Sequence, residues 1–114
     1  MATLATQVIV RTGLAPSYAA AAGGGDAMET GDDMFLHVKN TSGGALTVTI
    51  AIPSSASTTS GVTYTNTAVS VPATTGDRMI GPISNIYKDT TTGLATITYS
   101  GVTSLTVGCF KVQP

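Results

Sequence analysis

Four acidic side chains in the segment GGGDAMETGDD are the residues best suited to bind a metal ion: Asp26, Glu29, Asp32 and Asp33. Calcium takes about six to eight oxygen ligands, often from loops rich in glycine and aspartate. The spacing of these four residues, however, does not match the pattern of an EF-hand loop. We therefore expect a solvated loop between two strands here, and a weak calcium site is the alternative.

The chain contains one histidine, His37, and one cysteine, Cys109. In the segment MFLHVK, His37 faces away from Leu36 and Val38, which predicts a half-exposed strand residue. The common zinc sites need several histidine or cysteine ligands. A catalytic thiolate needs a nearby base, so Cys109, in an apolar stretch, is expected to be a small buried side chain. A single cysteine excludes an intrachain disulfide and fits folding in a reducing cytoplasm.

Enzymatic motifs give no further candidates. A Ser–His–Asp arrangement could be assembled from His37 and one of many serines, but no G-x-S-x-G marks one of them. The segment GGGD lacks the lysine and the spacing of a P-loop, and it does not match a dinucleotide-binding fingerprint. We predict no enzymatic activity, no cofactor and no catalytic residue.

Charge and hydropathy limit the classes of partner. The net charge is −1, and the five basic residues are scattered along the chain, whereas nucleic-acid binding needs a basic face. No apolar run approaches the roughly 18 residues of a membrane span. We therefore expect neither nucleic acid nor a membrane as the partner. The basic residues are Arg11, Lys39, Arg78, Lys88 and Lys111.

A carbohydrate- or host-surface-binding module is an alternative function. Such modules present aromatic platforms to sugar rings, but this chain has no tryptophan and four tyrosines. Tyr99 alternates within an expected strand and is assigned to the core or its margin. Tyr64 lies in an uncharged loop, residues 53–67, where it could be displayed to a ligand.

Period-2 alternation of apolar and polar residues recurs between turn signals, and β-branched residues are abundant, so the sequence predicts an all-β fold. The connections are too short for crossover helices, which favours antiparallel pairing. We expect one domain over residues 1–114, a small antiparallel β-sandwich or barrel of about seven to eight short strands. The segment 78–83 is expected to be bulged or at an edge, and the last two segments to form a hairpin around Gly101. The candidate strands are residues 6–11, 34–39, 46–52, 68–71, 78–83, 94–100 and 104–112.

One segment has helical signals. Residues 16–22, PSYAAAA, begin with a proline and are followed by Gly23, which suits a helix start and stop. A helix of this length is marginal without packing. We therefore expect at most one short helical turn near the N-terminus, or an extended arm.

The N-terminal segment, about residues 1–7, is predicted to be an anchoring arm that reaches a neighbouring subunit. The alternative is a strand that starts early within the chain's own sheet. The residues assigned to a partner interface are Ala2, Thr3, Leu4, Ala5, Thr6, Gln7, Tyr18 and Tyr64.

From Asn40 to Gly76 the chain has no charged side chain, and charged residues make up only 10% of the whole, against about 25% in an ordinary domain. Threonine and serine can keep such strands hydrated without charge. Exposed strand edges, however, are normally blocked by charges against edge-to-edge pairing. We therefore expect these surfaces to be covered by copies of the chain or by a partner, and predict a homo-oligomer, with a trimer favoured.

The segments MATLATQVIVRTGLAPSYAAAAGGGD, FLHVKN, RMIGPI and GLATITYSGVTSLTVGCFKV resemble a group of small all-β virion structural proteins of tailed bacteriophages. The resemblance covers most of the chain and is weakest in residues 53–67. It implies a capsid decoration (cement) protein made in the host cytoplasm, which binds the major capsid protein on the surface of the virion, often as a trimer. A head–tail or tail component is the alternative within the same class.

Overall fold

The computed structural model describes residues 2–53, 58–59 and 62–113. It confirms the all-β prediction: strands dominate, in two five-stranded sheets and one two-stranded ribbon. The first sheet has the order β1 (Ala2–Thr3), β4 (Asp26–Met28), β11 (Ala95–Tyr99), β6 (Leu46–Ile50), β9 (Thr67–Val71). The second has the order β10 (Gly76–Ile80), β5 (Met34–Asn40), β12 (Leu105–Val112), β2 (Thr6–Ile9), and β3 (Ala19–Ala20) also pairs with β12. The ribbon consists of β7 (Thr58–Thr59) and β8 (Val62–Thr63).

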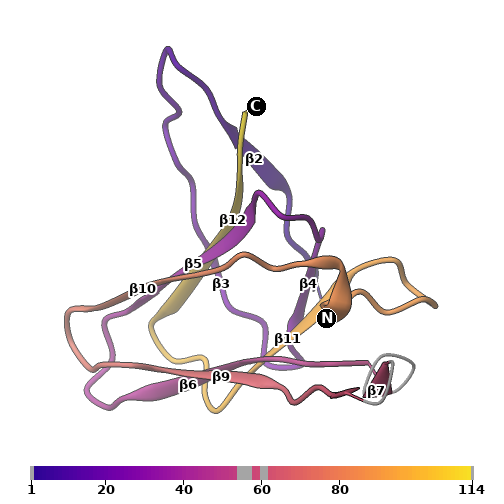
Figure 1. Ribbon diagram of the computed structural model, residues 1–114. Coiled ribbons are helices and arrows are strands. Elements are labelled where there is room, and N and C mark those ends of the chain that lie inside the picture. Colours follow the sequence, from indigo (N-terminus) through magenta and orange to yellow (C-terminus); the bar gives the residue numbers. More distant parts are fainter. Residues whose placement is uncertain (1, 54–57, 60–61, 114) are drawn as a thin grey trace.

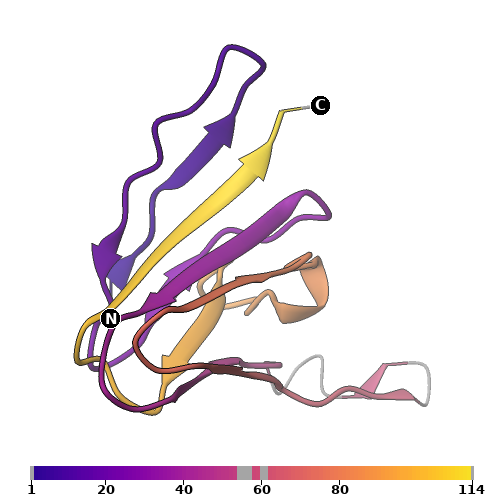
Figure 2. The same cartoon turned by 90° about the vertical axis from the view of Figure 1, so that its left-hand side faces the viewer.

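The two sheets form two layers with the core between them, as in a β-sandwich (Figure 1). Figure 2 shows the second sheet rising away from the first, with β2 and the end of β12 projecting beyond the layered part. Both inner faces contribute apolar side chains that water does not reach, which is the main source of stability in such a fold. The core includes Met28, Val48, Ile50, Val71 and Ile97 from the first sheet and Met34, Leu36, Val38, Leu105, Val107 and Cys109 from the second.

The alternation that predicted the strands also predicted their faces. Leu36 and Val38 point into the core, and Phe35, His37 and Lys39 lie on the outer face of the second sheet. In β6, Val48 and Ile50 are buried in the same way. The segment predicted at 78–83 overlaps the edge strand β10, which begins at Gly76 and ends at Ile80, so its position at an edge is confirmed.

The N-terminal segment crosses between the two sheets of its own chain. β1 pairs in parallel with β4, and β2 pairs in parallel with β12. Between them, Leu4 is buried in the core, and its backbone N–H donates to the Ala27 carbonyl at 2.8 Å. The structure therefore pairs this segment with sheets of its own chain, which was the alternative to an arm that reaches a neighbouring subunit. These two pairings are also the exceptions to the predicted antiparallel order.

The terminal hairpin predicted around Gly101 is wrong. β11 lies in the first sheet between β4 and β6, whereas β12 lies in the second sheet between β5 and β2. The short connection carries the chain from one layer to the other, because each strand buries one apolar face against the opposite sheet. The structure also has ten strands in its two sheets, more than the seven or eight expected. The additional strands β1, β3 and β4 are only two or three residues long, too short to show a period-2 pattern in the sequence.

Of the two forms expected for residues 16–22, a short helical turn or an extended segment, the structure has the extended one. Ala19 and Ala20 pair with Val107 and Thr106 of β12. The sheet thus satisfies backbone groups that a helix of two turns would leave largely unpaired. The 3-10 turn of the described chain lies elsewhere, at η2 (Asn85–Tyr87).

Candidate functional site

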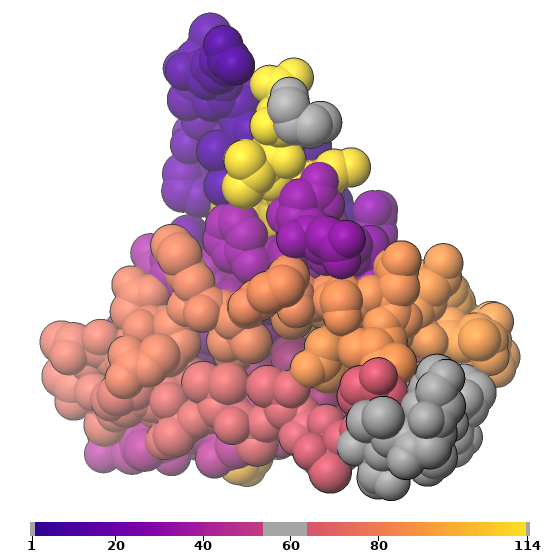
Figure 3. All heavy atoms as spheres, viewed as in Figure 1, coloured from indigo at the N-terminus to yellow at the C-terminus, as the bar shows by residue number. Residues whose placement is uncertain are grey.

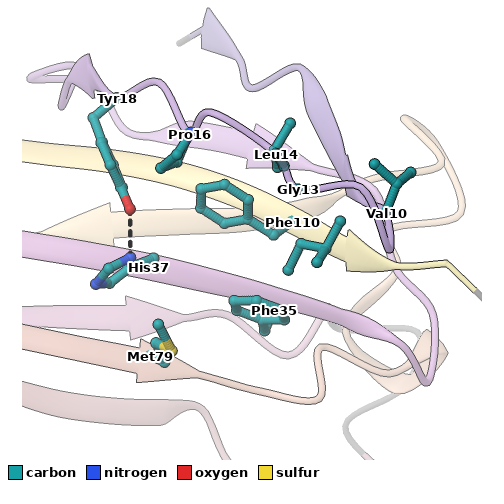
Figure 4. A pocket seen from close by; sticks show the side chains of 10 residues that line it. Val10, Gly13, Leu14, Pro16, Tyr18, Phe35, His37, Met79 and Phe110 are labelled. Atoms are coloured by element: carbon teal, nitrogen blue, oxygen red, sulfur yellow. Dashed lines mark hydrogen bonds between the residues drawn. The ribbon is translucent and has the colours of Figure 1, made fainter.

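An apolar cleft lies on the outer face of the second sheet. Its volume is about 240 Å³. Figure 4 shows the side chains of Phe35, His37 and Phe110 rising from the strands on one side and residues 10–18 running along the other. Exposed apolar clefts with a few polar groups are the usual form of small-ligand sites and of pockets for a partner's side chain. The lining consists of Ile9, Val10, Gly13, Leu14, Pro16, Tyr18, Phe35, His37, Met79 and Phe110.

Residues 10–18, here called the strap, form one wall of the cleft. They leave β2 through a turn at Arg11 and Thr12 and return to β12 at β3. Phe110 faces outward from β12 and would lie in solvent without the strap, yet it is only 3% exposed. Two hydrogen bonds join the Gln7 side chain to the backbone of the strap. Gln7 Nε2 donates to the Ser17 carbonyl at 2.8 Å, and Ser17 N–H donates to Gln7 Oε1 at 2.9 Å.

Aromatic rings make the floor of the cleft. The rings of Phe35 and Phe110 stack with centroids 5.6 Å apart, and Tyr18 packs against Phe110 at 5.9 Å. Lys39 places its ammonium 4.3 Å from the centre of the Tyr18 ring, a cation–π contact. Met79 stands at the open side and is 68% exposed. The cleft therefore combines a rigid floor with one flexible side chain at its mouth.

His37 links three elements at one end of the cleft. The Tyr18 hydroxyl of the strap lies 2.7 Å from His37 Nδ1, and Asp77 of β10 lies within hydrogen-bond distance of His37 Nε2. The neutral ring accepts from Tyr18 and donates to Asp77; the protonated ring donates to both. His37 is 7% exposed, so the prediction of a half-exposed residue is wrong. Tyr18 and Asp77, which are 19 and 40 residues away, cover it.

The hydrogen bonds of His37 join the strap, β5 and β10; they do not activate a serine hydroxyl. Both ring nitrogens of His37 are engaged, by a phenol and a carboxylate. A base that activates a serine needs one of these nitrogens for the hydroxyl. Among the described residues, therefore, His37 is not part of a Ser–His–Asp arrangement in this conformation.

Cys109 is buried in the core, as predicted. Its Sγ lies 3.3 Å from the carbonyl oxygen of Ala5 and 3.7 Å from that of Leu4, the two residues that connect β1 to β2. Burial raises the pKa of the Cys109 thiol. A buried thiol with a raised pKa is a poor nucleophile, so its role here is packing.

The acidic segment is the predicted solvated loop between two strands for three of its four acids, but not for Asp26. Asp26 is 1% exposed within β4, and its Oδ2 accepts a hydrogen bond from the Tyr99 hydroxyl at 2.6 Å. Glu29, Asp32 and Asp33 are exposed. In the described part of the chain no three acidic, histidine or cysteine side chains gather closely enough to hold a metal ion.

The outer face of the first sheet is a second surface of interest. Val48, Ile50, Val71 and Ile97 point into the core, so the alternate residues of β6, β9 and β11 point outward. Thr98 pairs with Thr49, which pairs with Ala68 on the next strand. Every side chain is small and uncharged. We call this surface the threonine face: Thr47, Thr49, Ala68, Ser70, Thr96 and Thr98.

The residues predicted for a partner interface fall in three places. Tyr18 belongs to the cleft, and Tyr64 is 38% exposed beside the ribbon, as expected for a displayed residue. The N-terminal residues lie on the edges of both sheets and in the core, so the fold does not bring them together with Tyr64 as one surface in the described chain. They are Ala2, Thr3, Leu4, Ala5, Thr6 and Gln7.

The sequence did not indicate the cleft. The alternation in β5 placed Phe35 and His37 on one face, which was the available signal. Their partners Phe110 and Asp77 are far away in the sequence, and residues 16–22, which include Tyr18, carried helical signals. Only the register of β5 with β12 and β10 brings these residues together.

No family model, curated protein or solved structure matches the chain. In the described residues, no helix has the length and apolar character needed to cross a bilayer.

Proposed function

We propose that the chain is a non-enzymatic structural protein of a tailed-bacteriophage virion. Its most specific form is a capsid decoration (cement) protein that binds the outside of the major capsid lattice and stabilises it. The resemblance of its sequence segments to such proteins is the first support. The single structural observation that supports it is the threonine face.

The threonine face suits close contact with another protein surface. Burying an unpaired charge in an interface costs several kcal/mol, and this face carries none. Its hydroxyls can form hydrogen bonds with a partner or with bridging waters, and its small side chains let a partner approach closely. A free domain would ordinarily carry mixed charges on the outer face of a sheet.

A binding experiment with particles tests the proposal. The protein is mixed with phage shells that lack it, and co-sedimentation is measured. Thr49→Lys with Thr98→Lys places two ammonium groups in the middle of the threonine face, and we expect binding to fall at least tenfold. The matched control is Thr90→Lys, in an exposed turn outside the threonine face. Unimpaired binding of the double variant would overturn the assignment of this face.

The alternative is a carbohydrate- or host-surface-binding module, and the exposed Tyr64 is the observation that favours it. A glycan-binding assay with Tyr64→Ala as its control distinguishes the two functions. Binding that depends on Tyr64, without any association with shells, would replace the shell role.

A further inference from the structure

The four terminal strands of the two sheets differ in how they are protected against pairing with another chain. An edge strand exposes a row of unpaired backbone N–H and C=O groups, and proteins block such edges by shortness, charge or proline. β1 has two residues and β2 has four. β10 carries Asp77 and Arg78.

β9 has none of these devices. Its sequence, TAVSV, has five residues without charge or proline, and among the described strands it pairs only with β6. Ala68 and Ser70 are exposed. Figure 3 shows the rose-coloured residues of β9 uncovered on the surface, beside the orange β10 segment. Of the described sheet edges, β9 is the longest that is uncharged.

We propose that two copies of this chain pair antiparallel through β9, around Val69. This inference rests on the proposed assembly role, and it specifies how one copy of the chain binds another. A two-fold axis perpendicular to the sheet sets Val69 opposite its own copy, Ala68 opposite Ser70, and Thr67 opposite Val71. All these pairs are neutral. The same operation on β10, centred on Arg78, would set two guanidinium groups against each other, which is destabilising.

Pairing through β9 would join the threonine faces of the two copies into one surface. The axis keeps the outer faces of both copies on the same side, so two five-stranded sheets become one continuous sheet. Ala68 and Ser70 then lie at its centre rather than at a rim. The assembly closes at two copies, because an isologous contact uses the same edge on both. It therefore predicts a dimer rather than the trimer that the sequence favoured.

Disulfide trapping tests the register. Ala68→Cys and Ser70→Cys are made as separate variants and mixed under mild oxidation. Opposed residues of an antiparallel pair have Cα separations of about 4.5–5.5 Å, within the range of a disulfide. We expect the mixture to give a cross-linked dimer in much higher yield than either variant alone. Thr98→Cys, on the same face but on the interior strand β11, is the matched control. The proposal would be overturned if Ala68→Cys cross-linked with Thr98→Cys as well as it does with Ser70→Cys.

Light scattering of the unmodified protein tests the stoichiometry. We expect a mass twice the 11.4 kDa of the chain. The double variant Ala68→Lys with Ser70→Lys should be a monomer that retains its β circular-dichroism spectrum. The control Thr98→Lys should stay a dimer. A wild-type monomer or trimer would contradict pairing through β9. Shell binding is measured separately: a monomer that binds shells would sink the pairing alone, and a dimer that ignores shells would sink the shell role alone.

Discussion

The Tyr99 hydroxyl donates a 2.6 Å hydrogen bond to Asp26, whose carboxyl group is enclosed between the sheets. The Ala22 backbone N–H also reaches the same oxygen, at 3.3 Å. The contact joins β4 to β11, 73 residues later in the chain. A buried carboxyl group held by a phenol and a backbone donor fixes the position of β4, so it serves the fold rather than a metal ion.

Asp26→Ala is expected to destabilise the protein strongly. The change leaves the Tyr99 hydroxyl and the Ala22 N–H without their acceptor, which costs about 1.5–3 kcal/mol for a bond to a charged or strongly polar group. The free energy of unfolding from urea denaturation measures it. Asp33→Ala, at an exposed acid of the same segment, is the control and should change stability by less than about 0.5 kcal/mol. Equal effects would contradict a structural role for Asp26.

Stability should fall at alkaline pH through Tyr99. Burial, followed by the hydrogen bond to Asp26, raises the pKa of Tyr99 above its ordinary value of 10.0. Because the folded pKa is the higher one, the stabilisation is complete below about pH 10 and is lost as the pH rises above it. Tyr99→Phe should flatten this decline between about pH 9 and pH 11. Tyr64→Phe should leave it unchanged; an equal decline in wild type and Tyr99→Phe would contradict the assignment.

Gly25→Ala is expected to lower the free energy of unfolding by about 1–3 kcal/mol. Gly25 has a φ of +94°, and an added Cβ would stand 2.6 Å from the Ile97 carbonyl oxygen. The left-handed conformation and the contact with backbone both oppose a side chain at the turn that leads into β4. The control is Gly23→Ala, where a Cβ meets nothing within 4 Å. Thermal unfolding of both variants gives the comparison, and a Gly25→Ala protein as stable as Gly23→Ala would refute the strain.

Tyr18→Phe should loosen the strap. It removes the hydrogen bond to His37, which is worth about 1 kcal/mol, and so raises the population of the open strap about fivefold. Trypsin cleaves after Arg11, at the turn of the strap, and its rate at low protease concentration follows that population. We expect cleavage at Arg11 to accelerate about fivefold, and Tyr64→Phe to have no effect. An unchanged rate would mean that Gln7 and the apolar contacts hold the strap without His37.

Calcium should leave the melting temperature unchanged. The four acids considered as ligands do not converge, since Asp26 points to Tyr99 while the other three are exposed. A bound ligand at 100 times its Kd would add about 2.7 kcal/mol. A clear rise of the melting temperature with millimolar calcium, reversed by a chelator, would restore the metal site as a candidate.

The sequence by itself determined the local features of this protein. Period-2 alternation specified most of the longer strands and the inward faces of β5 and β6, because side chains on a strand alternate whatever the strand pairs with. Cys109 followed from its apolar neighbours, and the exposure of Tyr64 from its polar loop. These features depend on residues within a few positions of one another.

Tertiary structure decided which strands meet. Nothing local distinguishes a hairpin from a crossing between layers, so β11 and β12, which looked like a hairpin, entered different sheets. Residues 16–22 looked helical, but a short helix is weaker than pairing with an available edge of β12. Asp26 looked solvated until β11 brought the Tyr99 hydroxyl to it, and His37 looked half-exposed until Tyr18 and Asp77 covered it. Burial of a polar residue depends on partners distant in the sequence, and only the register of the sheets supplies them.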